Sequence, residues 1–418
     1  MSRDQWALLR GDLAGAGTER QRRLHGRLVR ADAALRALPE VRVYVADTPN
    51  LGHQAASLRI AERLVHEVGY RGRITLVYED EHPANEPTLP KIARLHPHLA
   101  DAGTREVAWG DAVVRALPIS RLASLPTAEL GITGGSELDA TLLAQALRTR
   151  TLLVLQPFHW RWAVDRLAFA DGRPSIMLAD DDVLGHGFCE RAYRVAPQPT
   201  PAFLRDAQQD GVSLGVVYGL RAPGVSTLDP TRALTSYAEM IVESLGTSSR
   251  RASLLLFDPI APTCDIHDPR LQLVHVGTVP ETAFVAAIAH ATLPPLFEGQ
   301  TTATIAVGAG VPYLQLADAG LSEPPPYARL PELPHAFADA VALSEAAAAG
   351  MHALAAGGGD AHDRRAVAAF LAQAALAESP LCRYAAALGA YYAVRGNDKL
   401  DIALMALTTL LPPAPDAL

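Results

Sequence analysis

The sequence predicts an α/β protein with two Rossmann-like domains and helical segments at both ends. Apolar strand-like runs alternate with amphipathic helical runs from residue 41, and a second series of this kind starts at residue 213. With 418 residues, the chain is too long for one compact core. A proline-rich stretch at 196–202 separates the two series, so we interpret it as a linker. Strands joined by single helices indicate parallel sheets with right-handed crossovers.

The expected elements follow the chain in order. In the first series the strands are 41–46, 73–78, 106–109, 129–133 and 151–155, and the helices are 54–68 and 138–147. In the second series the strands are 213–218, 252–257, 271–276, 292–293 and 312–316, and the helices are 234–245 and 281–289. Residues 333–411 are mostly helical in pattern and rich in alanine. We therefore divide the chain into a helical segment 1–38, domains 39–195 and 203–330, and a helical segment 331–418.

Composition narrows the functional classes. The chain is 49% hydrophobic and 20% charged, which is typical of a globular protein, and its net charge of −8 argues against a general nucleic-acid binder. The three cysteines, Cys189, Cys264 and Cys382, are far apart, so we expect no disulfide framework and a reducing cytoplasm. The chain has no apolar signal core at its start and no apolar run near the roughly 18 residues of a membrane span. Frequent Ala and Arg suggest a bacterium with a GC-rich genome.

The segment 294–316 is the most informative part of the sequence. It reads as a polar turn, a helix opened by a threonine, a helix end at Gly308 and Gly310, and a short buried strand. A hydroxyl at a helix start caps backbone N–H groups, and the same N–H groups form an anion site. The predicted ligands of a donor phosphate or its sugar are Glu298, Gly299, Gln300, Thr301 and Thr302. The alternative is an ordinary crossover without a ligand.

Two polar residues lie where the first predicted strand meets the first helix. His53 follows Gly52 at the helix start, and imidazole titrates near working pH, so it suits a base that takes a proton from an acceptor. Asp47, at the strand end, would orient His53 or act as the base itself. In the alternative interpretation, His53 only caps or packs.

Other candidates lie at later strand ends. Gly134 and Gly135 would let the backbone approach a substrate closely, and Glu137 would accept from an acceptor hydroxyl or serve only as a first-turn acid. His159 belongs to an aromatic cluster that would stack on a sugar or pack in the core. Arg221 follows the strand 213–218 and suits a diphosphate through its planar fork.

Metal-ligand residue types are clustered in the loop 264–268, but no second group supports them, so no metal is predicted. No nucleophile elbow, Walker A loop or full Gly-x-Gly-x-x-Gly motif is present, which disfavours α/β-hydrolases, P-loop NTPases and ordinary NAD enzymes.

Two stretches of the chain resemble the GT-B glycosyltransferases, in which two α/β domains face a cleft. The stretch 284–292 with the Gly310-Val311-Pro312 turn resembles their donor domain, and Asn50-Leu51-Gly52-His53 resembles the Gly-His turn of the bacterial cell-wall N-acetylglucosamine transferase group. The resemblance implies an acceptor domain at 39–195, a donor domain at 203–330 and a nucleotide-sugar co-substrate without metal or other cofactor. One residue departs from the pattern. Ile305 stands where these relatives carry a glutamate for the nucleotide ribose, and Glu298 is a possible substitute.

Three hypotheses follow. The first is a cytoplasmic glycosyltransferase that moves a sugar from a nucleotide-sugar to an unknown acceptor. The second is a catalytically silent GT-B-like protein that binds a peptide or partner enzyme, as Ile305 suggests. The third is a nucleotide-sugar epimerase, which shares the fold.

Overall fold

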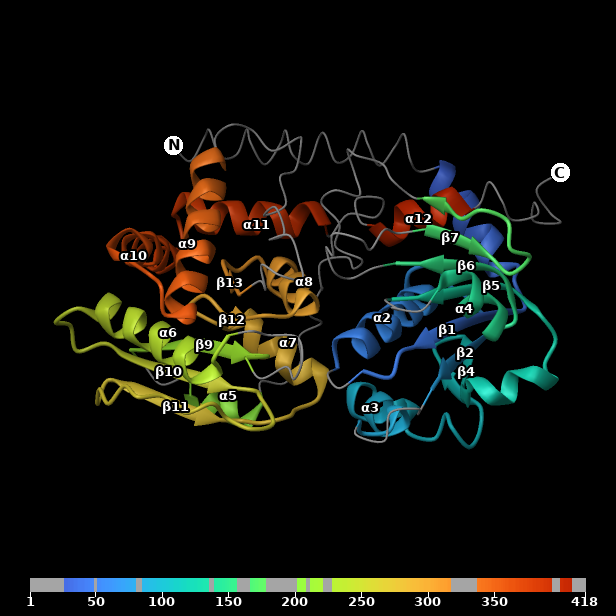
Figure 1. Ribbon diagram of the computed structural model, residues 1–418, viewed down its shortest axis with the longest axis horizontal. Helices are drawn as coiled ribbons and strands as arrows, with labels where there is room; N and C mark the ends of the chain where they lie inside the picture. The colour runs from blue at the N-terminus through green and yellow to red at the C-terminus, as the bar shows by residue number, and fades with distance from the viewer. Residues whose placement is uncertain are drawn as a thin grey trace. The chain divides into compact units, whose positions relative to one another are not determined.

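A computed structural model describes residues 26–48, 51–79, 85–134, 139–155, 166–177, 201–207, 211–220, 228–316, 337–392 and 399–407. The chain divides into two compact units. The first unit contains 14–191 and 394–418, and the second contains 1–13 and 192–393. Each unit holds one mostly parallel sheet with helices, which confirms the predicted α/β class with two Rossmann-like domains (Figure 1). The division into four segments stays a prediction.

The sheet of the first unit has the strand order β3-β4-β2-β1-β5-β6-β7-β8. Its five central strands are parallel: β4 (Ala112–Pro118), β2 (Arg73–Tyr78), β1 (Glu40–Val45), β5 (Ala128–Thr133) and β6 (Thr149–Val154). The edges are antiparallel: β3 (Val107–Trp109) pairs with β4, and β7 (Arg166–Phe169) pairs with β6 and β8 (Ile176–Met177). The expectation of a parallel sheet is therefore wrong at these edges, and the strands β4, β7 and β8 were not predicted. Between β3 and β4, Gly110 has φ +58, which permits a tight turn in place of a crossover.

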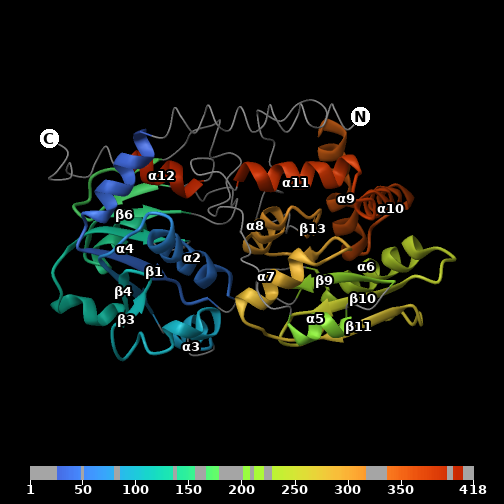
Figure 2. The same cartoon turned by 180° about the vertical axis from the view of Figure 1, so that it is seen from behind.

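Helices cover both faces of this sheet. On one face α2 (Gly52–His66), α3 (Thr88–Leu95), α12 (Lys399–Leu407) and the helical residues 26–36 enclose the larger apolar core. On the other face α4 (Ala140–Ala146) packs through Leu143 and Leu147. The short 3-10 helices are η1 (Pro97–Leu99) and η2 (Ile119–Ser124). Both views show α12 beside the helix at 26–36, where Met405 packs against Leu28 (Figures 1 and 2).

The sheet of the second unit is parallel throughout, in the order β11-β10-β9-β12-β13. Its strands are β9 (Val212–Tyr218), β10 (Arg251–Leu256), β11 (Leu271–His275), β12 (Leu296–Phe297) and β13 (Leu314–Gln315). The strand expected at 292–293 is wrong, because β12 begins after the two prolines that follow. Proline has no N–H for the ladder, so pairing resumes only at Leu296.

The predicted helical C-terminal part is confirmed for the described residues. Helices α6 (Pro230–Leu245), α9 (Ala338–Ala356), α10 (Ala361–Ala374) and α11 (Pro380–Tyr392) enclose one apolar core of the second unit. Figure 1 shows α9 and α10 beside α6. Helices α5 (Ala202–Ala207) and α7 (Glu281–Ala289) contact the sheet through aromatic pairs such as Phe284 with Tyr218. Helix α8 is Gln300–Ala309. In the described part of the chain, no helix is both long and apolar enough to cross a membrane.

Candidate functional site

Both sheets share one order of parallel strands, and this order creates a switch point in each. In the first sheet the chain runs from β1 to β2 and β4 on one side, then returns to place β5 and β6 on the other side of β1. In the second sheet it runs from β9 to β10 and β11, then returns to place β12 and β13 on the other side of β9. In open α/β sheets, ligands bind at such points, outside the carboxyl ends of the strands. The residues after β1, β5, β9 and β12 are therefore the candidate site of each unit.

At the end of β1, Asp47 lies buried between polar partners from another part of the unit. The Asn85 Nδ2 donates to Asp47 Oδ1 at 3.0 Å, and the Lys91 Nζ lies 3.9 Å from the same oxygen. Lys91 also donates to the Thr48 carbonyl at 2.6 Å. The carboxylate of Asp47 is therefore held by the half-buried Asn85 amide and the buried Lys91 ammonium.

His53 is the second residue of α2, directly after Gly52, and is 8% exposed. Burial lowers the pKa of His53 to about 4, so its imidazole is neutral at pH 7. The neutral form can accept a proton, but a general base works best when its pKa is near the operating pH. The burial of His53 thus weakens it as a base, and the choice between His53 and Asp47 remains a prediction.

At the end of β5, Gly134 is required by packing. Its N–H donates to Ser57 Oγ at 3.3 Å, and a Cβ at this position would lie 2.8 Å from Ser57 N and 2.9 Å from the Ala56 carbonyl carbon. The close approach is thus to helix α2, and a substrate contact of Gly134 stays a prediction. Gly135, Glu137 and His159 lie outside the described residues.

The end of β9 is fixed by a buried aspartate. Gly219 has φ +80, and its N–H donates to Asp258 Oδ1 at 2.9 Å. The His275 Nε2 lies 2.9 Å from the Asp258 carbonyl oxygen, so the ends of three strands are joined. Burial, followed by the nearby carboxylates of Asp258 and Glu281, raises the pKa of Tyr218 to about 12. Arg221, in the loop that follows, lies outside the described residues.

Helix α8 starts next to this turn without a side-chain cap. A Cβ built at Gly219 would lie 3.9 Å from the Glu298 backbone nitrogen. The N-cap of α8 is Gly299, with φ −74 and ψ 138, and no side chain caps it among the described residues. The prediction that a threonine opens this helix is wrong, because the helix begins at Gln300, one residue earlier, and Thr302 is buried. The side chains of Gln300 and Thr301 lie outside the described residues.

Gln315 adds a buried polar group below the α8 start. Its side chain is 5% exposed, and its Nε2 donates to the Glu298 carbonyl at 3.2 Å. Its Oε1 is buried and has no hydrogen-bond partner among the described residues. Gln315 thereby ties the turn between β12 and α8 to the neighbouring strand.

Ile305 stands where the resembling enzymes carry a ribose-binding glutamate. Ile305 is buried within α8, so its side chain serves packing. Glu298, the possible substitute, is half-buried at the end of β12. Its contact with a ribose stays a prediction.

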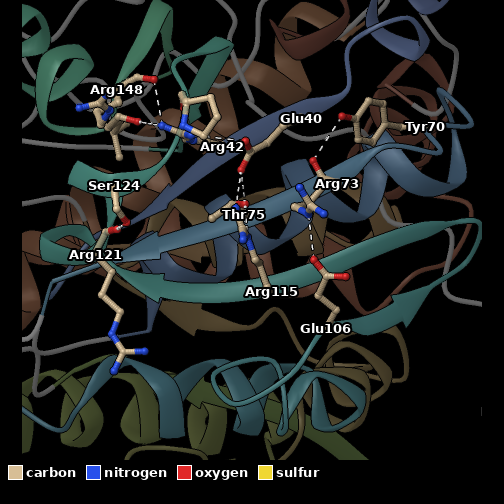
Figure 3. Close-up of polar contacts among 12 residues, drawn as sticks. Glu40, Arg42, Tyr70, Arg73, Thr75, Glu106, Arg115, Arg121, Ser124 and Arg148 are labelled. Atoms are coloured by element: carbon tan, nitrogen blue, oxygen red, sulfur yellow. Dashed lines mark hydrogen bonds and ion pairs between the residues drawn. The ribbon is translucent and has the colours of Figure 1, made fainter.

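Among the described residues of the first unit, the most buried charged side chain is Arg42, at the amino end of the central strand β1. Figure 3 shows Arg42 near the start of β1, where it is fully buried and donates to the carbonyls of Leu147 (2.6 Å), Arg148 (2.9 Å) and Pro126 (2.6 Å). Burial acts to raise the pKa of Glu40, but its hydrogen bond from Thr75 and the charge of Arg42 hold that pKa below its ordinary value. Since this cluster lies at the amino edge, we assign it to stability.

A polar hollow of about 400 Å³ lies between α6 and the turn from α9 to α10. Its charged groups are largely paired: Arg364 contacts Glu239 at 3.2 Å, and Arg232 donates to the Ala356 carbonyl at 3.1 Å. Among the described residues no group of three or more His, Cys, Asp or Glu side chains is arranged to hold a metal. In the loop 264–268, Asp268 pairs with Arg270 at 2.8 Å.

The sequence did not predict three polar residues near the carboxyl ends of the strands: Lys91, Asp258 and Gln315. Asp258 directly follows a predicted strand, so its position was a usable signal. Gln315 lies inside a predicted strand, where a polar residue between leucines indicates the opposite face. No pattern marked Lys91, because the helix α3 was not predicted.

Comparisons with protein-family models and with curated proteins give no match. Among solved structures, the chain is similar to Arabidopsis thaliana UGT89C1 complexed with UDP-L-rhamnose, with 14% identity, 90% of this chain and 99% of that chain covered, and a TM-score of 0.41. This similarity is too low to carry an argument, so the fold assignment rests on the strand orders. The strand orders define a protein with two Rossmann-like units, which is the domain composition of the GT-B plan.

Proposed function

We propose that the protein is a glycosyltransferase that moves a sugar from a nucleotide-sugar to an acceptor without a metal ion. One observation carries the proposal: at the switch point of the second sheet, the Gly219 turn lies beside the uncapped start of α8. Backbone N–H groups at a helix start, together with the helix dipole, favour a negatively charged ligand. A glycine turn lets such a ligand approach the backbone closely.

The leaving group of this reaction is a nucleoside diphosphate. Its negative charge grows as the bond to the sugar breaks, so donors fixed before the reaction stabilise the transition state. The α8 start supplies neutral donors of this kind, with Gln300, Thr301, Thr302 and Arg221 as further proposed ligands. Glu298 would bind the ribose in place of the acid missing at Ile305.

The first unit would bind the acceptor. Asp47 or His53 takes the proton of an acceptor hydroxyl, the oxygen attacks the anomeric carbon of the donor sugar, and the bond to the diphosphate breaks. Gly52, Gly134, Gly135, Glu137 and His159 are the proposed substrate contacts. Membership of the cell-wall N-acetylglucosamine transferase group is the narrower form of this proposal.

A calorimetric titration with UDP, TDP and GDP tests the donor site. The substitution Gly299→Asp places a carboxylate at the N-cap, where the backbone angles suit a capping aspartate. It should preserve or raise stability but weaken diphosphate binding at least tenfold, about 1.4 kcal/mol, since the new carboxylate occupies the anion site. The matched control is Gly358→Asp, which adds the same charge where a Cβ meets nothing within 4 Å. Titrations in EDTA should give the same affinity.

Equal affinity of Gly299→Asp and wild type would refute the α8 site. Absence of binding to every diphosphate at millimolar concentration would favour the second function, a silent scaffold that binds a protein partner. The observation that favours this alternative is the buried Ile305. Diphosphate release without an acceptor would instead favour an epimerase.

A further inference from the structure

Lys91 is an unusual residue for its position. It lies on α3 and is only 1% exposed, although lysine is almost never fully buried unless it is paired. On the same helix, Arg94 pairs with Glu86, and about a third of each side chain is exposed. The ammonium of Lys91 therefore has an environment that an ordinary surface cation lacks.

The Lys91 ammonium contacts the segment that follows β1. Its Nζ donates to the Thr48 carbonyl at 2.6 Å and lies 3.9 Å from Asp47 Oδ1, which also accepts from Asn85 at 3.0 Å. A backbone carbonyl and a carboxylate of adjacent residues are thus held by one cation.

A second buried side chain holds the same segment from α2. Gln54 is fully buried, and its Nε2 donates to the Ala46 carbonyl at 2.7 Å and lies 3.2 Å from Thr48 Oγ1. Two different helices thus fix residues 46–48. The described contacts restrain both the backbone of this segment and the Asp47 side chain.

Stability alone does not require a buried ion pair. Removing two charges from water costs free energy that their attraction often fails to recover, and apolar replacements are frequently neutral or stabilising. A lysine at this place is better explained by a need to hold Asp47 and Thr48 in one position. Charged groups at the carboxyl end of a central strand are where function is expected in this type of sheet.

We infer that Lys91 is a positioning residue that holds the Asp47 carboxylate and the Thr48 carbonyl in the geometry needed for the transfer reaction. This inference rests on the proposed function, with Asp47 as the group that acts on the acceptor. Lys91 itself does not touch the reacting atoms. It acts on catalysis through Asp47, so its effect on kcat must disappear when the Asp47 carboxylate is removed.

A double-mutant cycle in kcat tests the coupling. Lys91→Met, and Lys91→Gln as a variant that retains a donor for the Thr48 carbonyl, should each lower kcat at least tenfold and leave the donor KM within about twofold. In the Asp47→Asn background, either change at Lys91 should cost no further activity. Arg94→Met is the matched control on the same helix and should leave kcat unchanged. Unchanged kcat in the Lys91 variants, or losses that multiply in the double variant, would overturn the inference.

The same double-mutant cycle is also measured as free energies of unfolding in urea, which do not depend on catalytic activity. If Lys91 holds Asp47, the double variant Lys91→Met with Asp47→Asn should be no less stable than the less stable single variant. Costs that add would show that the two side chains act independently and would overturn the inference. Failure of the wild type to turn over any nucleotide-sugar would refute the proposed function, and the unfolding cycle would still decide whether Lys91 holds Asp47.

Discussion

Single buried polar residues carry most of the chemistry proposed for this protein. His53, Asp47 and Lys91 lie within one unit around the end of β1, and each is shielded from water. Shielding changes what these groups can do. It keeps the imidazole of His53 neutral at pH 7, whereas an exposed histidine would be partly charged just below that pH.

Burial of His53 predicts a specific pH dependence of stability. Its pKa is about 4 in the folded state, against 6.5 in an ordinary environment, so between these values the unfolded chain binds more protons. Stability is therefore lost as the pH falls below about 6.5. From pH 7.5 to pH 5, wild type should lose about 2 kcal/mol more unfolding free energy than His53→Gln.

Urea unfolding at both pH values measures this difference. His267→Gln is the control, because it removes a histidine from an exposed loop position. It should follow the wild type at both pH values. A constant difference between wild type and His53→Gln across this range would contradict the burial of the imidazole.

Among the elements, the end of α4 shows how a buried charge can organise a turn. Helix α4 ends at Ala146, and the chain reverses into β6 through Arg148, a non-glycine residue with φ +50. The carbonyls of Leu147 and Arg148 point to the Arg42 guanidinium, which neutralises the negative end of the helix. Arg42 thereby links β1 to the start of β6.

Arg42→Met should destabilise the protein by about 3–5 kcal/mol, because one buried and two part-buried carbonyls, together with the Glu40 carboxylate, lose their donor. Chemical denaturation followed by circular dichroism measures the loss. The comparison variant is Arg150→Met, which removes an exposed pair with Glu129 and should cost less than about 1 kcal/mol. Equal costs for the two variants would show that Arg42 does not organise this turn.

At the scale of the whole molecule, helix α12 near the end of the sequence belongs to the first unit. Helix α12 follows the second unit in sequence, yet Leu400, Leu404 and Leu407 lie in the apolar core of the first unit. Asp401 on this helix pairs with Arg63 of α2 at 3.3 Å. The first unit is thus completed by a segment that the chain reaches only after the second unit.

Leu404→Ala should destabilise the first unit by about 2–5 kcal/mol through the lost burial and the cavity that remains. Hydrogen exchange read by mass spectrometry should then show lost protection in β1, β2 and β5. Leu371→Ala, on α10 in the core of the second unit, should reverse the pattern and expose β9 and β10. Loss of protection in β9 and β10 on Leu404→Ala would contradict the assignment of α12.

The alternation of apolar and amphipathic runs was enough to predict most elements. The strand β2 and the helix α7 have the predicted bounds, and β9, β10 and α6 differ by a few residues at their ends. Local spacing also placed Asp47 and His53 after β1, where the structure has them, since both follow a strand that was predicted. It failed for β12, where two prolines shift the strand, and for β4, which follows β3 without a helix.

The sequence by itself determined the class of this protein, its two α/β halves and the strand ends at which polar residues gather, because these depend on the period and spacing of residues close in the chain. Only the tertiary structure decided the strand order, the place of α12 and the burial of Lys91 against Asp47 and Thr48. Each of these depends on contacts between residues far apart in sequence, and no local pattern specifies which distant side chain fills a given space in the core. The site proposed here therefore combines residues that the sequence marked with partners that only the folded chain brings to them.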